Sequence, residues 1–445
     1  MTWRLSTQDP EFEAQFTRFL AAPRDGDRDV SGTVEEIITA VRRNGDAALL
    51  SQTRKLDRWP ATAESLAVSA EMRRDARRQV DSETYQALEL AATRIRTFHE
   101  AQRPQDHQLD DGLGLKSGWR WRAVEAAGLY VPGGTAAYPS SVLMNAIPAR
   151  VAGVERLVMV MPSPDGQLNP LALCAAELAG VDELYRVGGA QAIAALAYGT
   201  ETIAPVDVIV GPGNAYVATA KRLVFGQVGI DMVAGPSEIL LLADAANDPA
   251  WLAADLLAQA EHDPAAQSIL MSDSAPLMRA VEAALAEQLA TLPRREIAAA
   301  SWQQHGAMIE LASLDEAPTL IDRIAPEHLH IATQEPQALF EAVRNAGSVF
   351  LGALTPEPLG DYLAGPNHVL PTNRAARYAS GLGVLNFMKR TSVLEASRKG
   401  IAALGPAAMA LASAERLDAH ARALALRLEG LQALASSDQS KRRDR

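Results

Sequence analysis

Cysteine is nearly absent from this sequence. The 445 residues contain one cysteine, Cys174. A single thiol excludes an internal disulfide and any metal site built from several thiolates. Unpaired thiols are typical of reducing compartments, so the composition favours the cytoplasm.

Long apolar runs are also missing. No stretch reaches the roughly 18 uncharged residues that a membrane-spanning helix needs. The start, Met1-Thr2-Trp3-Arg4, leads into acidic and polar residues rather than into the apolar core of a secretory signal. We therefore expect neither a membrane partner nor export.

Positive charge is in short supply. The 42 Lys and Arg are outnumbered by 54 Asp and Glu, which gives a formal net charge of −12. Proteins that bind nucleic acids cluster Lys and Arg to meet the phosphates. The one basic run, residues 441–445, is short and reads as a solvated end. The charge balance argues against a nucleic-acid partner.

The first part of the chain reads as helices. A length of 445 residues suits two or three domains. Helices are expected over residues 10–21 and 81–102. Between them, Thr33-Val34-Glu35-Glu36 resembles a capping box that opens another helix, and Asn44-Gly45 is a pair that ends helices.

From residue 128 onward, β-rich runs alternate with helical runs. A first series extends to about residue 225, and a second begins after residue 235. Such alternation is typical of βαβ units around a parallel sheet, so we expect an α/β fold. Residues 352–385 are rich in Gly and Pro and form either a functional loop or a linker. Residues 392–436 read as helices.

Four glycine-rich turns are expected at strand ends. Beyond the carboxyl ends of parallel strands, glycine lets a backbone approach a phosphate, and the following helix start favours an anion. None of the turns has the full dinucleotide-binding pattern, so nucleotide binding and plain turn geometry both remain open. The turns are Tyr130-Val131-Pro132-Gly133-Gly134, Val187-Gly188-Gly189-Ala190-Gln191, Gly211-Pro212-Gly213-Asn214 and Gly235-Pro236-Ser237-Glu238.

Gln259 and His262 form a possible half of a metal site. Their spacing of three places both side chains on one helix face, one turn apart. Asp361 and His420 are the best candidates for two further ligands, and a set of Gln, His and Asp suits zinc. On the residues alone, scattered structural histidines remain the alternative.

Glu327-His328 is a possible acid/base pair, because His titrates near neutrality and burial raises the pKa of Glu. Neighbours on a strand point to opposite faces, so both serve one site only at a strand end, which Pro326 just before them favours. His330 is interpreted as structural. His368 and Glu415 are further candidates at the edge of a cleft.

Together these stretches resemble the histidinol dehydrogenase family over residues 30–430. Beyond the turns given above, the matching segments are Gln259-Ala260-Glu261-His262, Ala325-Pro326-Glu327-His328-Leu329, Gly360-Asp361-Tyr362 and Gly365-Pro366-Asn367-His368-Val369-Leu370-Pro371-Thr372. Many ordered motifs in one chain are far more specific than any one of them.

The resemblance implies two incomplete Rossmann-like domains with parallel sheets, small helical domains at both ends, and a homodimer with shared active sites. Residues 28–127 and 237–382 would form the first Rossmann-like domain, with the zinc and acid/base residues. Residues 128–236 would form the second, on the NAD side. Residues 1–27 would be an N-terminal helical arm and 383–445 a C-terminal helical tail that intertwines in the dimer.

The resemblance also implies roles for single residues. One zinc ion per subunit would be held by Gln259, His262, Asp361 and, from the partner subunit, His420. Glu327 and His328 would be the acid/base pair, and Tyr130, Gln191 and Asn214 would contact NAD. The substrate L-histidinol would contact Ser237, His368 and Glu415, together with His328 and the zinc ligands. The reaction implied is oxidation through L-histidinal to L-histidine with two NAD reduced, the last steps of histidine biosynthesis.

Two other functions remain to be weighed. A related zinc- and NAD-dependent enzyme acting on another small polar alcohol, such as a sulfonated diol, would lose the residues that recognise an amine and an imidazole; His368 and Glu415 argue against it. A zinc-stabilised binding protein would need no acid/base pair. A hydrolase is disfavoured because four protein ligands leave zinc no open position for water.

Overall fold

The computed structural model describes residues 2–24, 29–133 and 138–443, with side chains as far as residue 434. The chain divides into two compact units. The first comprises Met1–Arg103 and Val124–Phe387, and the second comprises Pro104–Ala123 and Met388–Arg445. Gly134 of the first glycine-rich turn and residues 1 and 25–27 of the expected arm lie outside the described residues.

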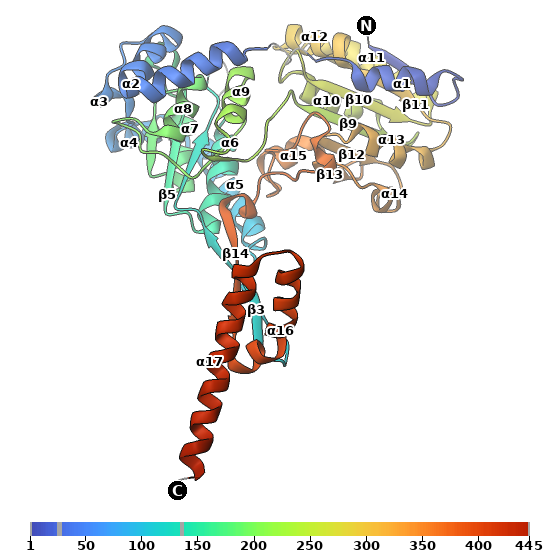
Figure 1. Cartoon of the computed structure of the whole chain (residues 1–445). Helices are drawn as coiled ribbons and strands as arrows, with labels where there is room; N and C mark the ends of the chain where they lie inside the picture. Colours follow the sequence, from blue (N-terminus) through green and yellow to red (C-terminus); the bar gives the residue numbers. More distant parts are fainter. Residues whose placement is uncertain (1, 25–28, 134–137, 444–445) are drawn as a thin grey trace. The chain divides into compact units, whose positions relative to one another are not determined.

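A six-stranded parallel sheet forms one half of the first unit (Figure 1). Alternate residues of its central strand face opposite sides: Leu240 and Leu242 join one core cluster, and Ile239 and Leu241 join the other. Both faces are therefore buried, as is typical of parallel sheets. The strands, in spatial order, are β1 (Trp3–Ser6), β11 (Ala307–Glu310), β10 (Gln267–Ser272), β9 (Glu238–Ala243), β12 (His328–Ala332) and β13 (Ser348–Leu351).

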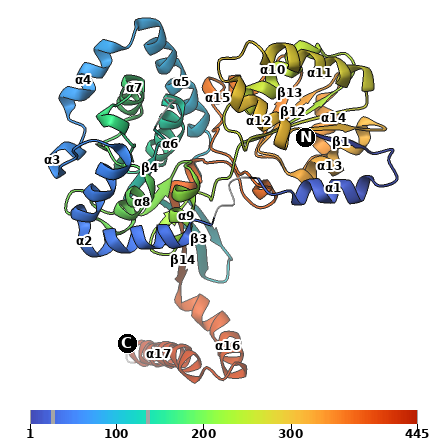
Figure 2. The same cartoon turned by 90° about the horizontal axis from the view of Figure 1, so that it is seen from above.

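Helices cover the two faces of this sheet. Figure 2 shows α10 and α11 on one side and α1 and α13 on the other. The helices of this half are α1 (Phe12–Ala21), α10 (Pro249–Ala260), α11 (Ala275–Leu289), α12 (Arg295–His305), α13 (Ala317–Ile324), α14 (Pro336–Ala342) and α15 (Glu357–Tyr362). Residues 3–21, expected as a helical arm, thus supply an edge strand and a covering helix to this sheet. The reason is burial: Leu5, Phe12, Phe16 and Phe19 all belong to its core.

A five-stranded parallel sheet forms the other half of the first unit. Its strands, in spatial order, are β6 (Glu183–Tyr185), β5 (Arg156–Val160), β4 (Ala126–Tyr130), β7 (Val208–Val210) and β8 (Gly229–Ile230). The helices between them are α6 (Pro139–Ala152), α7 (Pro170–Ala179), α8 (Gly189–Tyr198) and α9 (Ala215–Val224). Two parallel sheets with connecting helices confirm the α/β fold expected from the alternation.

The helices that precede this sheet in sequence also pack on it. They are α2 (Ser31–Asp57), α3 (Ala63–Leu66), α4 (Ala70–Gln79) and α5 (Ser82–Glu100), and α2 packs on α8 and α9, α4 on α7, and α5 on α6 and α7. The expected grouping of residues 28–127 with 237–382 therefore differs from the packing. The reason is that α2 shares a core with α8: Val34, Ile38 and Val41 lie in one cluster with Ile193 and Leu196. The segment therefore packs with the five-stranded sheet.

The second unit combines an antiparallel sheet with two helices. The strands are β14 (Met388–Ala396), β3 (Leu115–Ala123) and β2 (His107–Asp110), and the helices are α16 (Arg398–Ala414) and α17 (Asp418–Arg443). The sequence predicted only helices for the tail, so these strands were missed. Strands β3 and β14 pair although they lie more than 260 residues apart in the sequence. Local periodicity does not indicate which distant segments pair.

The start and the break predicted for the helix around residues 33–45 had different outcomes. The capping box is wrong: the helix begins at Ser31, and it is Asp29 whose side chain accepts a hydrogen bond from the Ser31 N–H, at 3.0 Å. The break at Gly45 is real, because its φ of 50° and ψ of −130° interrupt the helix. Every described helix is too short or too polar to cross a membrane.

Candidate active site

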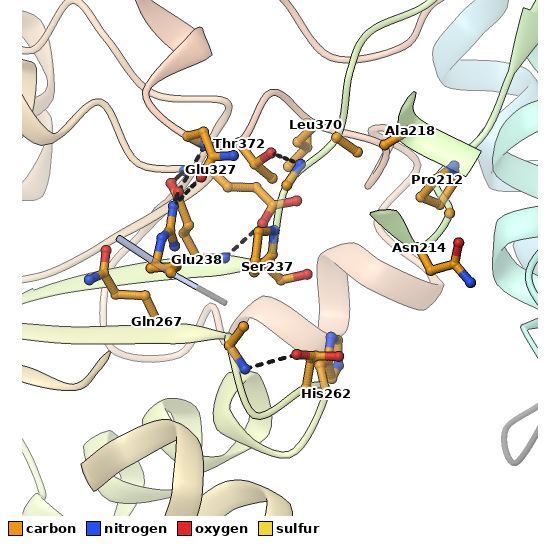
Figure 3. Close-up of a pocket in the computed structure, with 18 of the residues that line it drawn as sticks. Pro212, Asn214, Ala218, Ser237, Glu238, His262, Gln267, Glu327, Leu370 and Thr372 are labelled. Carbon is orange, nitrogen blue, oxygen red and sulfur yellow. Dashed lines mark hydrogen bonds and ion pairs between the residues drawn. The ribbon is translucent and has the colours of Figure 1, made fainter. Parts of the chain in front are cut away.

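One large pocket opens in the first unit, and Figure 3 shows part of its lining. Its volume of about 1370 Å³ exceeds the range typical of small-molecule sites, so it has room for a substrate and part of a cofactor. Glu327 and His328 line it from the start of β12, and Ser237 lines it from just before β9. Gly133 and Asn214 line it from beyond the ends of β4 and β7.

The two sheets contribute opposite strand ends to this pocket. The five-stranded sheet contributes the carboxyl ends of its strands, as expected for a nucleotide-binding sheet. The turn Gly235-Pro236-Ser237 instead leads into β9 and lies at the amino end of that strand. The strand expected to follow this turn is thus present as β9.

Glu327 is a buried carboxyl, 6% exposed. Its Oε2 accepts a hydrogen bond from the Glu238 backbone N–H at 2.8 Å, and its own N–H donates to Oε2 of Glu238 at 3.2 Å. Burial raises the pKa of Glu327 well above its ordinary value of 4.5, and the neighbouring Glu238 charge raises it further. Once ionised, such a carboxylate is a better proton acceptor than one in water.

His328 is a buried, neutral imidazole. Its Nδ1 lies 2.9 Å from the carbonyl oxygen of Glu238. A carbonyl only accepts, so Nδ1 carries the proton and Nε2 presents its lone pair. Among the residues that the structure describes, none makes a hydrogen bond to this Nε2. Burial lowers the pKa of His328 to about 4, so the ring is unprotonated at neutral pH.

Gln259 carries the clearest sign of a missing ligand. Helix α10 starts with Pro249 behind the N-cap Asp248 and ends at Ala260, which places Gln259 in its last turn and His262 just beyond it. The Gln259 side chain is fully buried, yet neither amide atom has a hydrogen-bond partner within the described part of the chain. Buried polar groups are otherwise almost always paired, so this amide fits a bound ion or ligand.

Asp361 and His262 also line the pocket, and the charges of both act on the same two histidines, His328 and His368. Burial lowers the pKa of His328 and His368; the Asp361 charge opposes that shift in both, whereas His262 adds to it. An amide oxygen, an imidazole and a carboxylate are donors that zinc accepts. Three of the four expected zinc ligands thus belong to the first unit.

Glu357 is a candidate that the sequence analysis missed. It begins α15, is 2% exposed, and stands four residues before Asp361, so both lie on one helix face. Possible ligand atoms of His328, Glu357 and Asp361 lie within 4.8 Å of one another. Burial, and then the Asp361 charge, raise the pKa of Glu357. This trio shares only Asp361 with the expected zinc ligands, and the spacing of four was the signal available in the sequence.

Of the expected NAD residues, Tyr130 ends β4, Asn214 lies beyond β7, and Gln191 lies in the first turn of α8, which follows β6. Tyr130 is buried, which raises its pKa to about 12, and its hydroxyl accepts a hydrogen bond from the Gly189 N–H at 3.2 Å. Gln191 is also buried, and its Oε1 has no partner among the described residues. Asn214 is exposed and caps α9 by accepting from Tyr216 and Val217, which leaves its amide N–H groups available. Asn214 lines the pocket, and Tyr130 and Gln191 are outside its lining.

A buried ion pair holds the turn that leads to Asn214. Lys221 and Asp231 have side chains that are 2% and 0% exposed. Lys221 Nζ donates to the Gly211 carbonyl at 2.9 Å, and Asp231 Oδ2 accepts from the Gly211 N–H at 2.8 Å. Gly211 has a φ of +110°, and an added Cβ would lie 2.1 Å from the Tyr130 carbonyl oxygen, so only glycine fits.

The remaining expected residues fall in both units. His368 lines the pocket, and burial lowers its pKa. Ser237 lines the same pocket. Glu415 ends α16 and His420 lies in the first turn of α17, both in the second unit and both exposed.

Comparisons with known proteins agree on one family. A family model described as histidinol dehydrogenase matches residues 20–428. The histidinol dehydrogenase of Rhodopseudomonas palustris is 60% identical over 428 residues, which cover 96% of this chain and 99% of that protein. That of Bradyrhizobium diazoefficiens is 59% identical with the same coverage. The crystal structure of histidinol dehydrogenase from Elizabethkingia anophelis is similar with a TM-score of 0.92 at 35% identity, covering 97% of this chain and 99% of that one.

Proposed function

The chain belongs to the histidinol dehydrogenase family, and we propose that its pocket oxidises L-histidinol through L-histidinal to L-histidine with one zinc ion and two molecules of NAD. Family membership makes it an NAD-dependent oxidoreductase of histidine biosynthesis. The observation that carries the proposal is the neutral His328, whose open Nε2 shares the pocket with Glu327.

Zinc would be held by Gln259, His262, Asp361 and His420 of the partner subunit. The unpartnered amide of Gln259 and the clustering of Asp361 with pocket histidines fit this ion. Bound there, zinc would anchor the imidazole and amine of the substrate, both of which are good zinc ligands. The shared site makes the working form a homodimer, and the lone Cys174 is consistent with a cytoplasmic enzyme.

The chain's own residues handle the protons. His328 Nε2 takes the proton of the alcohol as hydride leaves the carbon. Glu327 takes a proton from the water that adds to the aldehyde, which makes a hydrate able to lose a second hydride. Each hydride goes to one NAD, for which Tyr130, Gln191 and Asn214 are the proposed contacts. Ser237, His368 and Glu415 would contact the substrate; Glu415 supplies the charge that matches an ammonium group.

The test measures NADH formed per L-histidinol consumed, before and after a chelator removes metal and zinc is restored. We expect a ratio of about two that disappears on stripping and returns with zinc. A ratio of about one would remove Glu327 from its role, because the aldehyde step would then fail. No NADH from histidinol, with zinc bound, would refute the substrate and favour an enzyme for another polar alcohol.

Variants separate the two residues. Glu327→Gln should stop the reaction after the first NADH, and His328→Asn should slow both steps, each by about 10²–10⁴-fold. Glu183→Gln is a control, because Glu183 also stands at the amino end of a parallel strand, yet it lies outside the pocket lining. We expect that control to react like the parent protein.

A further inference from the structure

Glu238 is the only described residue that hydrogen-bonds both Glu327 and His328. It starts β9, the strand next to β12, and is 3% exposed. Its backbone N–H donates to the Glu327 carboxylate, and its carbonyl accepts from Nδ1 of His328. Its own carboxylate accepts from the Glu327 N–H. Three hydrogen bonds therefore join one residue to the pair.

The carboxylate of Glu238 is held in turn by two residues from distant parts of the chain. Arg24 forms an ion pair with Oε1 and also donates to Oδ1 of Asn373 at 2.6 Å. The Asn373 backbone N–H donates to the same Oε1 at 2.9 Å. Both oxygens of Glu238 thus accept from protein donors, Oε1 from Arg24 and Asn373 and Oε2 from Glu327. Figure 3 shows Glu238 beside Glu327 at the wall of the pocket.

We propose that Glu238 is a positioning residue that aligns Glu327 and His328 for proton transfer, with Arg24 and Asn373 fixing its side chain. The carbonyl selects the His328 tautomer whose Nε2 faces the reacting group. The N–H directs one oxygen of Glu327. Because a displacement of about 1 Å in such groups costs about a hundredfold in rate, the anchoring of this one side chain matters to both steps. This inference rests on the roles proposed for Glu327 and His328.

The direct test is Glu238→Gln in the full-length, zinc-loaded protein. The amide keeps one acceptor and loses the other, so the three donors around it cannot all be satisfied. We expect kcat to fall about a hundredfold, while KM for L-histidinol, KM for NAD and zinc content stay within about twofold. Arg24→Met is a milder variant for the site, because it keeps the Glu238 carboxylate and its hydrogen bonds from the Glu327 and Asn373 N–H groups, and we expect a loss of about tenfold in kcat.

A double-mutant cycle separates positioning from a general loss of structure. If Glu238 acts through the pair, Glu238→Gln should cost nothing more in a Glu327→Gln/His328→Asn background. The inference is overturned if kcat of Glu238→Gln and Arg24→Met stays within threefold of the parent, or if the loss persists undiminished in that background. Full activity of Glu327→Gln and His328→Asn would instead refute the proposed function, which keeps the two failures distinct.

Discussion

Replacing Lys221 with methionine should weaken the five-stranded sheet selectively. Methionine fills much of the space of the lysine stem, but it leaves the Asp231 carboxylate buried without its cation. Breaking one side of a buried ion pair costs about 3–5 kcal/mol. Asp231 keeps hydrogen bonds from the backbone N–H groups of Gly211 and Met232, so we expect the lower end, about 3 kcal/mol.

A second variant tests the cause. Lys221→Met combined with Asp231→Asn removes both charges and keeps an amide oxygen as an acceptor. What remains lost is chiefly the hydrogen bond to the Gly211 carbonyl, worth about 1 kcal/mol. The double variant should therefore recover about 2 kcal/mol relative to the single variant.

The assay is native-state hydrogen exchange read out peptide by peptide. This method reports local opening free energies and does not require the whole chain to unfold in one step. Protection should fall in β7 and α9 and stay unchanged in β9 and β12 of the other sheet. A single variant with unchanged protection in β7, or a double variant as weak as the single one, would refute the reasoning.

Two further perturbations have matched readouts. Gly211→Ala should strongly destabilise the protein, because the added Cβ would clash with the Tyr130 carbonyl oxygen. The control Gly226→Ala has a φ of +101° and open space around it, and it should lower the free energy of unfolding by only about 1–2 kcal/mol. Similar unfolding midpoints for the two variants would contradict the clash. Burial raises the pKa of Asp57 above its ordinary 3.8, so its contribution to stability is present below pH 3.8 and is lost as the pH rises through the folded-state pKa. Asp57→Asn should therefore gain in free energy of unfolding over the parent above that pKa and not below it, and parallel stability profiles across pH would show that Asp57 does not titrate in this way.

Local patterns predicted much of the first unit. The strand that precedes each helix and the residues of each turn follow from short-range chemistry, as at α8, where a glycine pair opens the helix at Gly189. The same patterns placed Glu327 and His328 at a strand start, where Pro326 stands just before them. Such features depend on residues only a few positions apart.

Long-range partnerships explain what the sequence did not reveal. Arg24 meets Glu238 across 214 positions, and Met388 pairs with Ala123 in the antiparallel sheet. An arginine in a polar loop and a glutamate at the start of an apolar strand give no local indication that they pair. The sheet on which α2 packs could not be predicted for the same reason, because an apolar helix face can pack on either sheet until the opposing side chains are known.

Strand β1 cannot pair until a much later part of the chain has been synthesised. Trp3 and its neighbours pair with β11, some 300 residues later in the sequence. At a synthesis rate of about 5–20 residues per second, the edge of the sheet is made about 15–60 s before its partner exists. During that interval the five-stranded sheet is completed, and Leu5, Phe12 and Phe16 have no sheet to cover. Residues 3–21 are thus among the last segments of this half to be docked.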